Sequence, residues 1–267
     1  MKLHARALGK PWGRTDLDRI FGAASDERVG EIWFTHPELD NPPLLIKYIF
    51  TSENLSVQVH PNDEQASQRG FVRGKNECWY ILAADKGAKL GLGLKSAASE
   101  SELRSAAIDG SIERLLDWRS VEPGDFFYVP AGTIHAIGAG ITLLEVQQNS
   151  DVTYRLYDYG RPRELHLDDG IRVAKRGPYE GRCLLGSSAS ANGPLVDEGP
   201  FSLIRAGSME DVPPSLASRQ RWVMPLAGTA SSGAEEASFG ECMLVQPGED
   251  LSLSPDAAVL IATAGRI

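Results

Sequence analysis

Cysteine is scarce in this sequence, and its arrangement excludes two kinds of structure. The 267 residues include three cysteines, Cys78, Cys183 and Cys242, which lie far apart and never form a Cys-x-x-Cys pair. A disulfide framework needs paired cysteines, and a thiolate zinc site needs several at short spacing. Neither can organise this chain, and the pattern fits a reducing environment such as the cytoplasm.

Long apolar runs and excess positive charge are also absent. No window approaches the roughly 18 apolar residues of a membrane span, and the N-terminal segment carries no apolar run of signal-peptide length. The formal net charge is −9 at pH 7 and no long run of lysine or arginine occurs, which disfavours nucleic acid and anionic membranes as partners. We therefore predict a soluble, cytoplasmic protein that binds neither of them.

What the sequence does contain is a succession of β-strand patterns. Residues 44–51, 55–60 and 77–84 are rich in β-branched and aromatic side chains and are bounded by polar, glycine or proline residues. Three strands in a row imply antiparallel pairing. Strand patterns return within 121–161 and, separated by turn residues, within 201–264. The predicted fold class is therefore all-β.

One convincing helical stretch interrupts the strands, from Ser99 to about Trp118. Ser99 and Glu102 have the spacing of a capping box, and Gly110 is placed to end the first helix. A shorter helix candidate lies at Asp16–Phe21. We interpret the longer stretch as an insertion that covers one end of the β structure, not as part of a catalytic site.

A stretch rich in glycine and serine, residues 186–194, has the composition of an exposed linker. It predicts a first domain of residues 1–185, with the helical insertion at about 97–118, and a second β domain of residues 195–267. The second domain contains no histidine. Any site that depends on histidine must therefore lie in the first domain.

Candidate metal ligands begin in the segment LSVQVHPND, residues 55–63. In an extended strand, successive side chains point to opposite faces, so Gln58 and His60 share one face and the apolar side chains share the other. Pro61 cannot donate to a strand ladder and marks a turn. His60 is therefore predicted at a strand end, at the mouth of the β structure.

Glu77 on the next strand and His135 after a Pro-Ala-Gly turn can complete a ligand set with Gln58 and His60. This set offers nitrogen and oxygen donors without a thiolate. Such donors suit Zn²⁺, Mn²⁺, Fe²⁺ or Co²⁺ better than Ca²⁺ or an iron–sulfur cluster. The sequence therefore predicts a divalent metal site in the first domain.

The spacing around His135 also matches a known pattern. Gly124, Pro130, Gly132 and His135 fit the second metal-binding motif of the cupin barrels at every fixed position. Gln58 replaces the first histidine of the usual first cupin motif, and in this the chain resembles the type I mannose-6-phosphate isomerases (phosphomannose isomerases). The segments that carry the resemblance are PWG, GEIWFTHP, LLIKYIFTSENLSVQVHPND, GKNECWYIL, VPAGTIHAI and EVQQNSDVTYRLYDYGR.

The resemblance implies a fold and a set of site residues. The implied fold is a cupin (jelly-roll) barrel with a small helical insertion and a second, shorter, metal-free cupin-like β unit. Gln58, His60, Glu77 and His135 fall on the family's zinc ligands, which implies one Zn²⁺ per chain, with other divalent metals possible. Arg155 falls on the family's essential arginine.

The implied reaction interconverts mannose 6-phosphate and fructose 6-phosphate through a cis-enediol, in a monomer or a homodimer. A metal ion or the Arg155 guanidinium can stabilise the negative charge of an enediolate. Lys75 and Glu145 are both candidates for the proton carrier. Lys75 projects to the same side as Glu77, so a bound cation would lower the pKa of Lys75, and it would also keep Glu145 ionised as a base. The sequence does not rank these two residues.

The phosphate group of such a substrate has no evident binding loop in this sequence. No GxxxxGK[ST] motif occurs, so scattered cations must hold the group, and Lys47, Arg73 and Lys95 are the candidates. Glu31 and Trp33 share one face of a predicted strand, either as packing residues or as a wall of the substrate site.

Two other functions stay open at this point. A cupin enzyme of the dioxygenase type would prefer an open iron site with fewer protein ligands and would need neither Lys75 nor Arg155. A non-catalytic sugar-phosphate-binding cupin would keep the site without turnover, and a fold alone does not exclude it. The presence of Lys75, Glu145 and Arg155 together favours the isomerase. The chain is shorter than many relatives, with a small helical insertion and a brief second β unit. Lids and domain junctions often carry the contacts that close over a substrate and hold its phosphate, so these contacts are the ones that the shortening puts in question.

Overall fold

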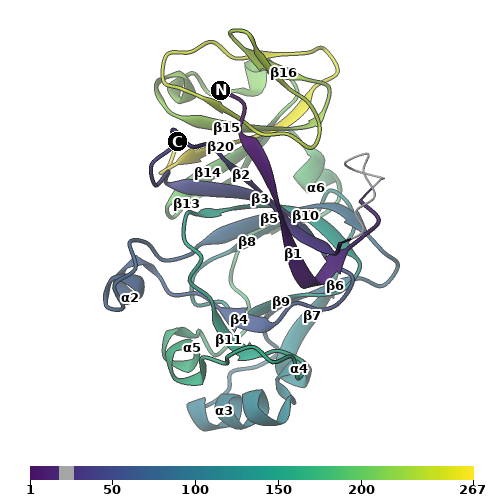
Figure 1. The fold of residues 1–267 in the computed structure, drawn as a ribbon, viewed down its shortest axis with the longest axis vertical. Helices are drawn as coiled ribbons and strands as arrows, with labels where there is room; N and C mark the ends of the chain where they lie inside the picture. The colour runs from purple at the N-terminus through teal and green to yellow at the C-terminus, as the bar shows by residue number, and fades with distance from the viewer. Residues whose placement is uncertain (18–26) are drawn as a thin grey trace.

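Two antiparallel sheets face each other and form the first part of the molecule (Figure 1). This computed structural model describes residues 1–17 and 27–267, so most of the predicted helix Asp16–Phe21 lies outside the described residues. The larger sheet contains, in spatial order, β1 (His4–Arg14), β2 (Val29–Thr35), β3 (Leu44–Phe50), β10 (Ile141–Gln148), β5 (Glu77–Ala84), β8 (Phe126–Val129) and β12 (Cys183–Leu184). The smaller sheet contains β11 (Tyr154–Tyr157), β4 (Val57–Val59), β9 (His135–Ile137), β6 (Lys89–Leu94) and β7 (Leu116–Ser120).

An apolar cluster fills most of the space between these sheets. Ile49, Trp79 and Phe127 extend from the larger sheet and pack with Leu90 and Leu92 of the smaller one, and all five are buried. Burying such side chains is the main favourable term in folding. The two sheets therefore pack face to face around a shared apolar interior, as in a jelly-roll barrel.

Three helices cover the outer face of the smaller sheet (Figure 1). They are α3 (Glu100–Asp109), α4 (Ile112–Leu115) and α5 (Leu167–Val173). Leu103, Ile112 and Ile171 of these helices pack against Val57 and Val59 of β4. Val57 and Val59, on the apolar face of β4, are consequently buried beneath the helices, whereas Gln58 on the polar face is half-buried.

The outer face of the larger sheet packs against the C-terminal part of the chain. Tyr48 and Phe50 belong to the same apolar cluster as Phe201, Trp222 and Leu260. The C-terminal part has a sheet of β13 (Gly193–Glu198), β14 (Phe201–Ala206), β20 (Ala258–Ala264), β15 (Arg221–Ala227) and β18 (Met243–Val245). It also has a small sheet of β17 (Glu235–Ala237), β16 (Ala230–Ser232) and β19 (Ser252–Leu253), and the short helices η1 (Met209–Asp211) and η2 (Pro214–Ser218).

The first residues of the chain join the C-terminal part. The backbone N–H of Leu3 donates to the carbonyl of Cys242 at 2.9 Å, and the N–H of Leu244 donates to the carbonyl of Met1 at 2.8 Å. The predicted linker contains helix α6 (Ser187–Ser190) and the start of β13. We keep the predicted domain boundary there as a proposal.

Pairing is antiparallel, as predicted, but the neighbours of the strands differ from their order in the chain. β3 and β5 both pair with β10, whereas β4 lies in the other sheet between β11 and β9. From β3 onward, apart from the neighbouring strands β6 and β7, consecutive strands thus alternate between the two sheets. This alternation is typical of a jelly roll and cannot be seen in local sequence patterns.

The helical insertion begins as predicted and ends earlier. Ser99 accepts from the N–H of Glu102 and donates its own N–H to the Glu102 carboxylate at 2.7 Å, so the capping box is confirmed. Gly110 follows with a φ of 79°, in the left-handed region that ends helices. The prediction of helix up to Trp118 was wrong, because β7 begins at Leu116 and pairs with β6.

Three α-helices were not predicted from the sequence: α2 (Asp63–Ser67), α5 and α6. Asn62, which follows the turn predicted at Pro61, caps α2 through a capping box with Gln65. Helix α5 contains Gly170, a poor helix former, at a point of close packing where an added Cβ would lie 2.7 Å from the Leu156 side chain. No helix in the described part of the chain is both long and apolar enough to span a membrane.

Candidate active site

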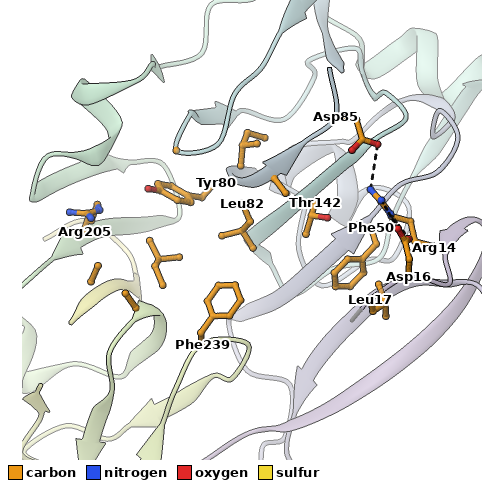
Figure 2. A pocket seen from close by; sticks show the side chains of 16 residues that line it. Arg14, Asp16, Leu17, Phe50, Tyr80, Leu82, Asp85, Thr142, Arg205 and Phe239 are labelled. Atoms are coloured by element: carbon orange, nitrogen blue, oxygen red, sulfur yellow. Dashed lines mark hydrogen bonds and ion pairs between the residues drawn. The ribbon is translucent and has the colours of Figure 1, made fainter. Parts of the chain in front are cut away.

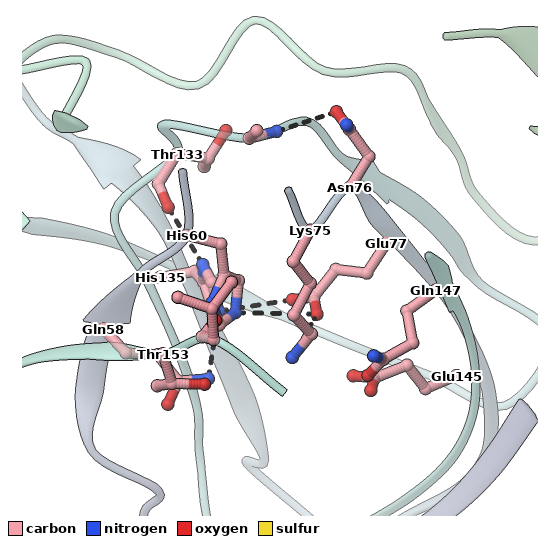
Figure 3. A network of polar contacts seen from close by, with 12 residues as sticks. Gln58, His60, Lys75, Asn76, Glu77, Thr133, His135, Glu145, Gln147 and Thr153 are labelled. Carbon is pink, nitrogen blue, oxygen red and sulfur yellow. Dashed lines mark hydrogen bonds and ion pairs between the residues drawn. The ribbon is translucent and has the colours of Figure 1, made fainter. Parts of the chain in front are cut away.

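Three potential metal ligands converge inside the barrel (Figure 3). His60 follows the end of β4, Glu77 is the first residue of β5 and His135 is the first residue of β9. Their ligating atoms all lie within 4.8 Å of one another, and all three side chains are buried. Strands from both sheets therefore bring together residues that lie up to 75 positions apart in the chain. His60 and Glu77 precede the helical insertion, and His135 follows it.

Both imidazole rings are held by backbone carbonyl groups. The Nδ1 atom of His60 lies 2.8 Å from the carbonyl oxygen of Val152, and Nδ1 of His135 lies 2.9 Å from that of Thr133. A carbonyl can only accept, so each Nδ1 carries a hydrogen and each Nε2 presents a lone pair. Burial lowers the pKa of His60 well below its ordinary value and that of His135 to about 4. Both rings are therefore neutral near pH 7.

The two Nε2 lone pairs face a carboxylate. Nε2 of His135 lies 3.2 Å from Oε1 of Glu77, and Nε2 of His60 lies 3.6 Å from Oε2. Nε2 of His60 and Oε1 of Glu77 are buried without a hydrogen-bond donor. Buried acceptors without donors are costly, and acceptors that face one another repel. A cation among them would relieve both costs, so His60, Glu77 and His135 fit a divalent metal ion.

Gln58 reaches the same group with its nitrogen. It lies directly opposite His135 in the β4–β9 pair, and its Nε2 is 3.2 Å from Nε2 of His135. Its Oε1 accepts from the hydroxyl of Ser56 at 3.1 Å. The predicted fourth ligand is therefore adjacent to the other three, but its oxygen points away from them.

Lys75 points toward the Glu77 carboxylate (Figure 3), and its Nζ lies 3.0 Å from Oε2. Gly74 permits this placement, because an added Cβ there would meet the backbone of Asn62 and Pro61 at about 2.4–2.5 Å. Burial by itself lowers the pKa of Lys75, but the charges of Glu77 and Glu145 outweigh it and raise the pKa. Lys75 is therefore a buried cation next to the candidate metal group.

Glu145 belongs to a row of side chains across neighbouring strands. Lys47 on β3 and Trp79 on β5 lie directly opposite it in the two strand pairs of β10. Nζ of Lys47 lies 3.0 Å from Oε1, and Nε1 of Trp79 donates to Oε2 at 2.9 Å. Burial acts to raise the pKa of Glu145, but Lys47, Lys75 and the Trp79 hydrogen bond outweigh it and lower the pKa to about 2. Glu145 is an ionised carboxylate with both oxygens engaged.

A cavity of about 270 Å³ opens beside these residues. Among the side chains that line it are Lys10, Trp12, Glu31, Trp33, Lys47, Gln58, Lys75, Glu145, Arg155 and Arg163. The predicted catalytic residues Lys75, Glu145 and Arg155 thus meet around one cavity with Gln58. Glu31 and Trp33 form part of its wall, which was one of the two predicted roles.

Arg155 offers this cavity a positive charge without a carboxylate partner in the described part of the chain. Nη1 of its guanidinium donates to the backbone carbonyl of Glu164 at 3.5 Å. Burial and the nearby charge of Arg163 both lower the pKa of Arg155. By contrast, Arg163 is held by the buried carboxylate of Asp158 through two contacts of 2.6 Å.

Some cavity residues were missed from the sequence, and two predicted ones lie elsewhere. Lys10 and Arg163 flank the segments PWG and EVQQNSDVTYRLYDYGR, so extending those segments by one or two residues would have found them. Of the three predicted phosphate ligands, Lys47 lines the cavity. Arg73 donates to Asn41 at 2.7 Å and Lys95 to the carbonyl of Arg114 at 2.9 Å, and neither lines it.

A larger cavity, of about 570 Å³, lies where the larger sheet of the barrel meets the C-terminal part (Figure 2). Its walls are mostly apolar and include Tyr80, Leu82 and Phe239, with Arg205 at one side. None of the candidate metal ligands lines it. Convergence of chemical groups, not size, therefore identifies the smaller cavity as the candidate active site.

Known proteins resemble this chain in sequence and in structure. Mannose-6-phosphate isomerase ManA of Bacillus subtilis (strain 168) is 48% identical in an alignment 159 residues long that covers 54% of this chain and 50% of that protein. Mannose-6-phosphate isomerase of Streptococcus mutans is 47% identical in an alignment 137 residues long that covers 49% of this chain and 43% of that protein. The resemblance to the mannose-6-phosphate isomerases is confirmed. No family model matches the chain.

The crystal structure of a mannose 6-phosphate isomerase from Bacillus subtilis is similar over the whole fold. Its TM-score is 0.75 at 26% sequence identity, and the match covers 98% of both chains. The predicted cupin fold is therefore confirmed. The chain spans about half the length of the curated mannose-6-phosphate isomerases that it matches in sequence.

Proposed function

We propose that this chain is a metal-dependent aldose–ketose isomerase that interconverts mannose 6-phosphate and fructose 6-phosphate. The observation that carries the proposal is the small cavity lined by Lys75 and Arg155, because Lys75 also contacts Glu77 of the His60, Glu77 and His135 group. The names of the relatives agree with it.

His60, Glu77 and His135 would hold the metal, with Gln58 as a fourth ligand. We propose Zn²⁺, one ion per chain, because nitrogen and oxygen donors in a four-ligand set suit it, while other divalent metals remain compatible. When bound, the ion would supply positive charge to sugar oxygens that become negative during enolisation.

Lys75 is the better placed of the two candidate proton carriers. Both oxygens of Glu145 are engaged by Lys47 and Trp79, and its pKa of about 2 makes it a weak base. Among the described residues, Glu77 is the one carboxylate within ion-pair distance of Lys75. Its pKa falls toward a useful value once the Glu77 charge is neutralised. We propose that Lys75 carries the proton and that Glu145 keeps Lys47 in place.

Arg155 is proposed to bind the anionic part of the substrate. Its guanidinium lines the cavity and is not committed to a carboxylate of the described residues. Such a planar group binds a phosphate, or two neighbouring sugar oxygens, in a bidentate manner. A sugar phosphate is therefore the proposed partner.

We also propose a cytoplasmic location, with which the three free cysteines agree.

The test is an isomerase assay on the purified, metal-loaded protein. Mannose 6-phosphate is supplied, and fructose 6-phosphate is detected through coupled enzymes, with and without a chelator. We expect turnover that the chelator abolishes and added Zn²⁺ restores. Binding without turnover would instead indicate a sugar-phosphate-binding cupin, and oxygen uptake by an iron-loaded protein would indicate a dioxygenase.

A further inference from the structure

Ser56 lies beside the candidate metal group without belonging to it. It precedes Gln58 by two residues on the same side of the extended chain, is 3% exposed and lines the small cavity. Its hydroxyl donates to Oε1 of Gln58 at 3.1 Å. In the described part of the chain, Ser56 and His135 are the hydrogen-bond partners of the Gln58 amide.

The orientation of this amide is set by His135. The Nδ1 hydrogen of His135 faces the Thr133 carbonyl, so its Nε2 can only accept, and the NH₂ group of Gln58 donates to it. The Gln58 oxygen then points to the Ser56 hydroxyl. The present arrangement is self-consistent, because each donor meets an acceptor.

The same orientation is incompatible with a metal ligand. A cation bound at His135 Nε2 would face the two hydrogens of the Gln58 NH₂ group, which carry partial positive charge. Divalent ions take the amide oxygen, not the amide nitrogen. For Gln58 to be a ligand, its terminal amide must therefore rotate by about half a turn, a motion that the broad terminal torsion of glutamine allows.

We propose that Ser56 is a positioning residue that supports the Gln58 amide in both orientations. It donates to Oε1 without metal and accepts from Nε2 with metal. A hydroxyl has one hydrogen and two lone pairs, so rotation about one bond reverses its role. After the reversal its hydrogen points to the cavity, which Ser56 lines. This inference rests on the proposed metal-dependent function.

The expected consequence is weaker metal binding when the hydroxyl is removed. In Ser56→Ala the rotated NH₂ group loses its acceptor at a buried position. Partners that orient a metal ligand typically change metal affinity by about 10- to 100-fold. Because this partner acts on one neutral ligand of four, we expect a loss near the lower limit, about 10-fold.

The first experiment is a double-mutant cycle in Zn²⁺ affinity, measured by competition with a chromogenic chelator. Ser56→Ala should weaken Zn²⁺ binding about 10-fold in the wild-type background and less than about 2-fold in a Gln58→Ala background. Equal losses in both backgrounds, or no loss in the wild-type background, would overturn the proposal. Ser56→Thr retains the hydroxyl and should restore affinity, whereas Ser56→Val, of the same shape, should not.

The second experiment follows the wild-type protein and uses one variant, only to identify a signal. The side-chain NH₂ signals of Gln58 are identified in a ¹H–¹⁵N spectrum by their absence from Gln58→Ala, and Zn²⁺ is added. We expect these signals to shift in step with occupancy as the hydrogen bond to His135 is exchanged for one to Ser56. Unchanged signals at full occupancy would overturn the proposal. Both experiments measure metal binding, so their failure would leave the isomerase assay unaffected, and a protein that binds Zn²⁺ as expected without turnover would contradict the proposed function alone.

Discussion

The two β parts of this molecule are built from similar antiparallel sheets and differ in what they bury. Buried acidic, basic and histidine side chains of the described residues up to 185 are Glu31, Lys47, His60, Lys75, Glu77, Asp125, His135, Glu145 and Asp158. From residue 195 onward, Arg221 is the buried charged side chain. Apolar packing is therefore common to both parts, and buried charge is concentrated in one.

The buried charges of the two parts also have different kinds of partner. Arg221 donates to the backbone carbonyls of Glu249, at 2.6 Å, and Gln246, at 3.2 Å, and so ties a turn to a strand. Lys47 pairs with Glu145 and Lys75 with Glu77, at the wall of a cavity. Burying charge is costly and apolar residues can often replace a buried pair without loss of stability. Buried charged side chains around a cavity therefore indicate a functional site more than a contribution to stability.

The largest effect is expected from removing a candidate metal ligand. His60→Ala should lose bound Zn²⁺ and reduce turnover by at least about 10³-fold, because the electrostatic stabilisation of the transition state goes with the ion. Metal content by mass spectrometry and the coupled assay measure both. The control is His36→Ala, at a partly exposed histidine that follows β2 and contacts the His4 ring, and it should change neither. A metal-loaded, active His60→Ala would show that the group is not the metal site.

Breaking the buried pair at Glu145 should mainly affect stability. Lys47→Met leaves a buried carboxylate without its cation, which typically costs about 3–5 kcal/mol. Urea unfolding at pH 7 measures this loss, and Lys89→Met on an exposed position should stay within about 0.5 kcal/mol of the wild type. Equal stabilities of the wild type and Lys47→Met would contradict the account of this pair.

The same pair predicts a pH dependence. The folded pKa of Glu145 is about 2, below its ordinary value of 4.5. A lowered carboxyl pKa stabilises the folded state above the unfolded pKa, and this contribution is lost as the pH falls through the folded pKa. The difference in stability between the wild type and Lys47→Met should therefore shrink between about pH 4.5 and pH 2.

A smaller, purely catalytic effect is expected at Arg155. Arg155→Ala should retain Zn²⁺ and lose about 10²–10³-fold in kcat, the usual cost of removing one group that stabilises developing charge. Arg104→Ala on the exposed face of α3 is a matched control and should behave as the wild type. Normal turnover by Arg155→Ala would remove this residue from the mechanism.

The smallest effect is expected at Arg221, the buried charge of the C-terminal part. Arg221→Met removes the donor to the Glu249 carbonyl and one of the two donors to the Gln246 carbonyl, which should cost about 1–3 kcal/mol of stability. Turnover per folded molecule and Zn²⁺ affinity should remain unchanged, because the residue lies in the C-terminal part. A loss of turnover in the folded variant would mean that the two parts are functionally coupled.

Much of the barrel was predictable because its strands have local signatures. The segments predicted at 44–51 and 77–84 correspond to β3 and β5, and His60 does follow the end of a strand, β4. Gln58, Glu77 and His135 could be named as candidate ligands because their flanking motifs are local. The helix α2 was also visible in principle, since Asn62 and Gln65 have capping-box spacing.

What could not be predicted depends on contacts between distant segments. The opposition of Gln58 and His135 comes from β4–β9 pairing, and the row of Lys47, Glu145 and Trp79 comes from the register of three strands. No local pattern encodes these neighbours, because alternate strands enter different sheets. The orientation of the Gln58 amide is set by a hydrogen bond across this pairing and was equally hidden.

The central claim is that the buried charges of the barrel form a metal-dependent isomerase site. The most direct test follows mannose 6-phosphate by NMR in D₂O with the wild-type protein, once freed of metal and once loaded with Zn²⁺. We expect fructose 6-phosphate to appear with the Zn²⁺-loaded protein and not with the metal-free protein, when the protein is far less concentrated than the substrate. Mannose 6-phosphate that persists unchanged with the Zn²⁺-loaded protein would contradict it.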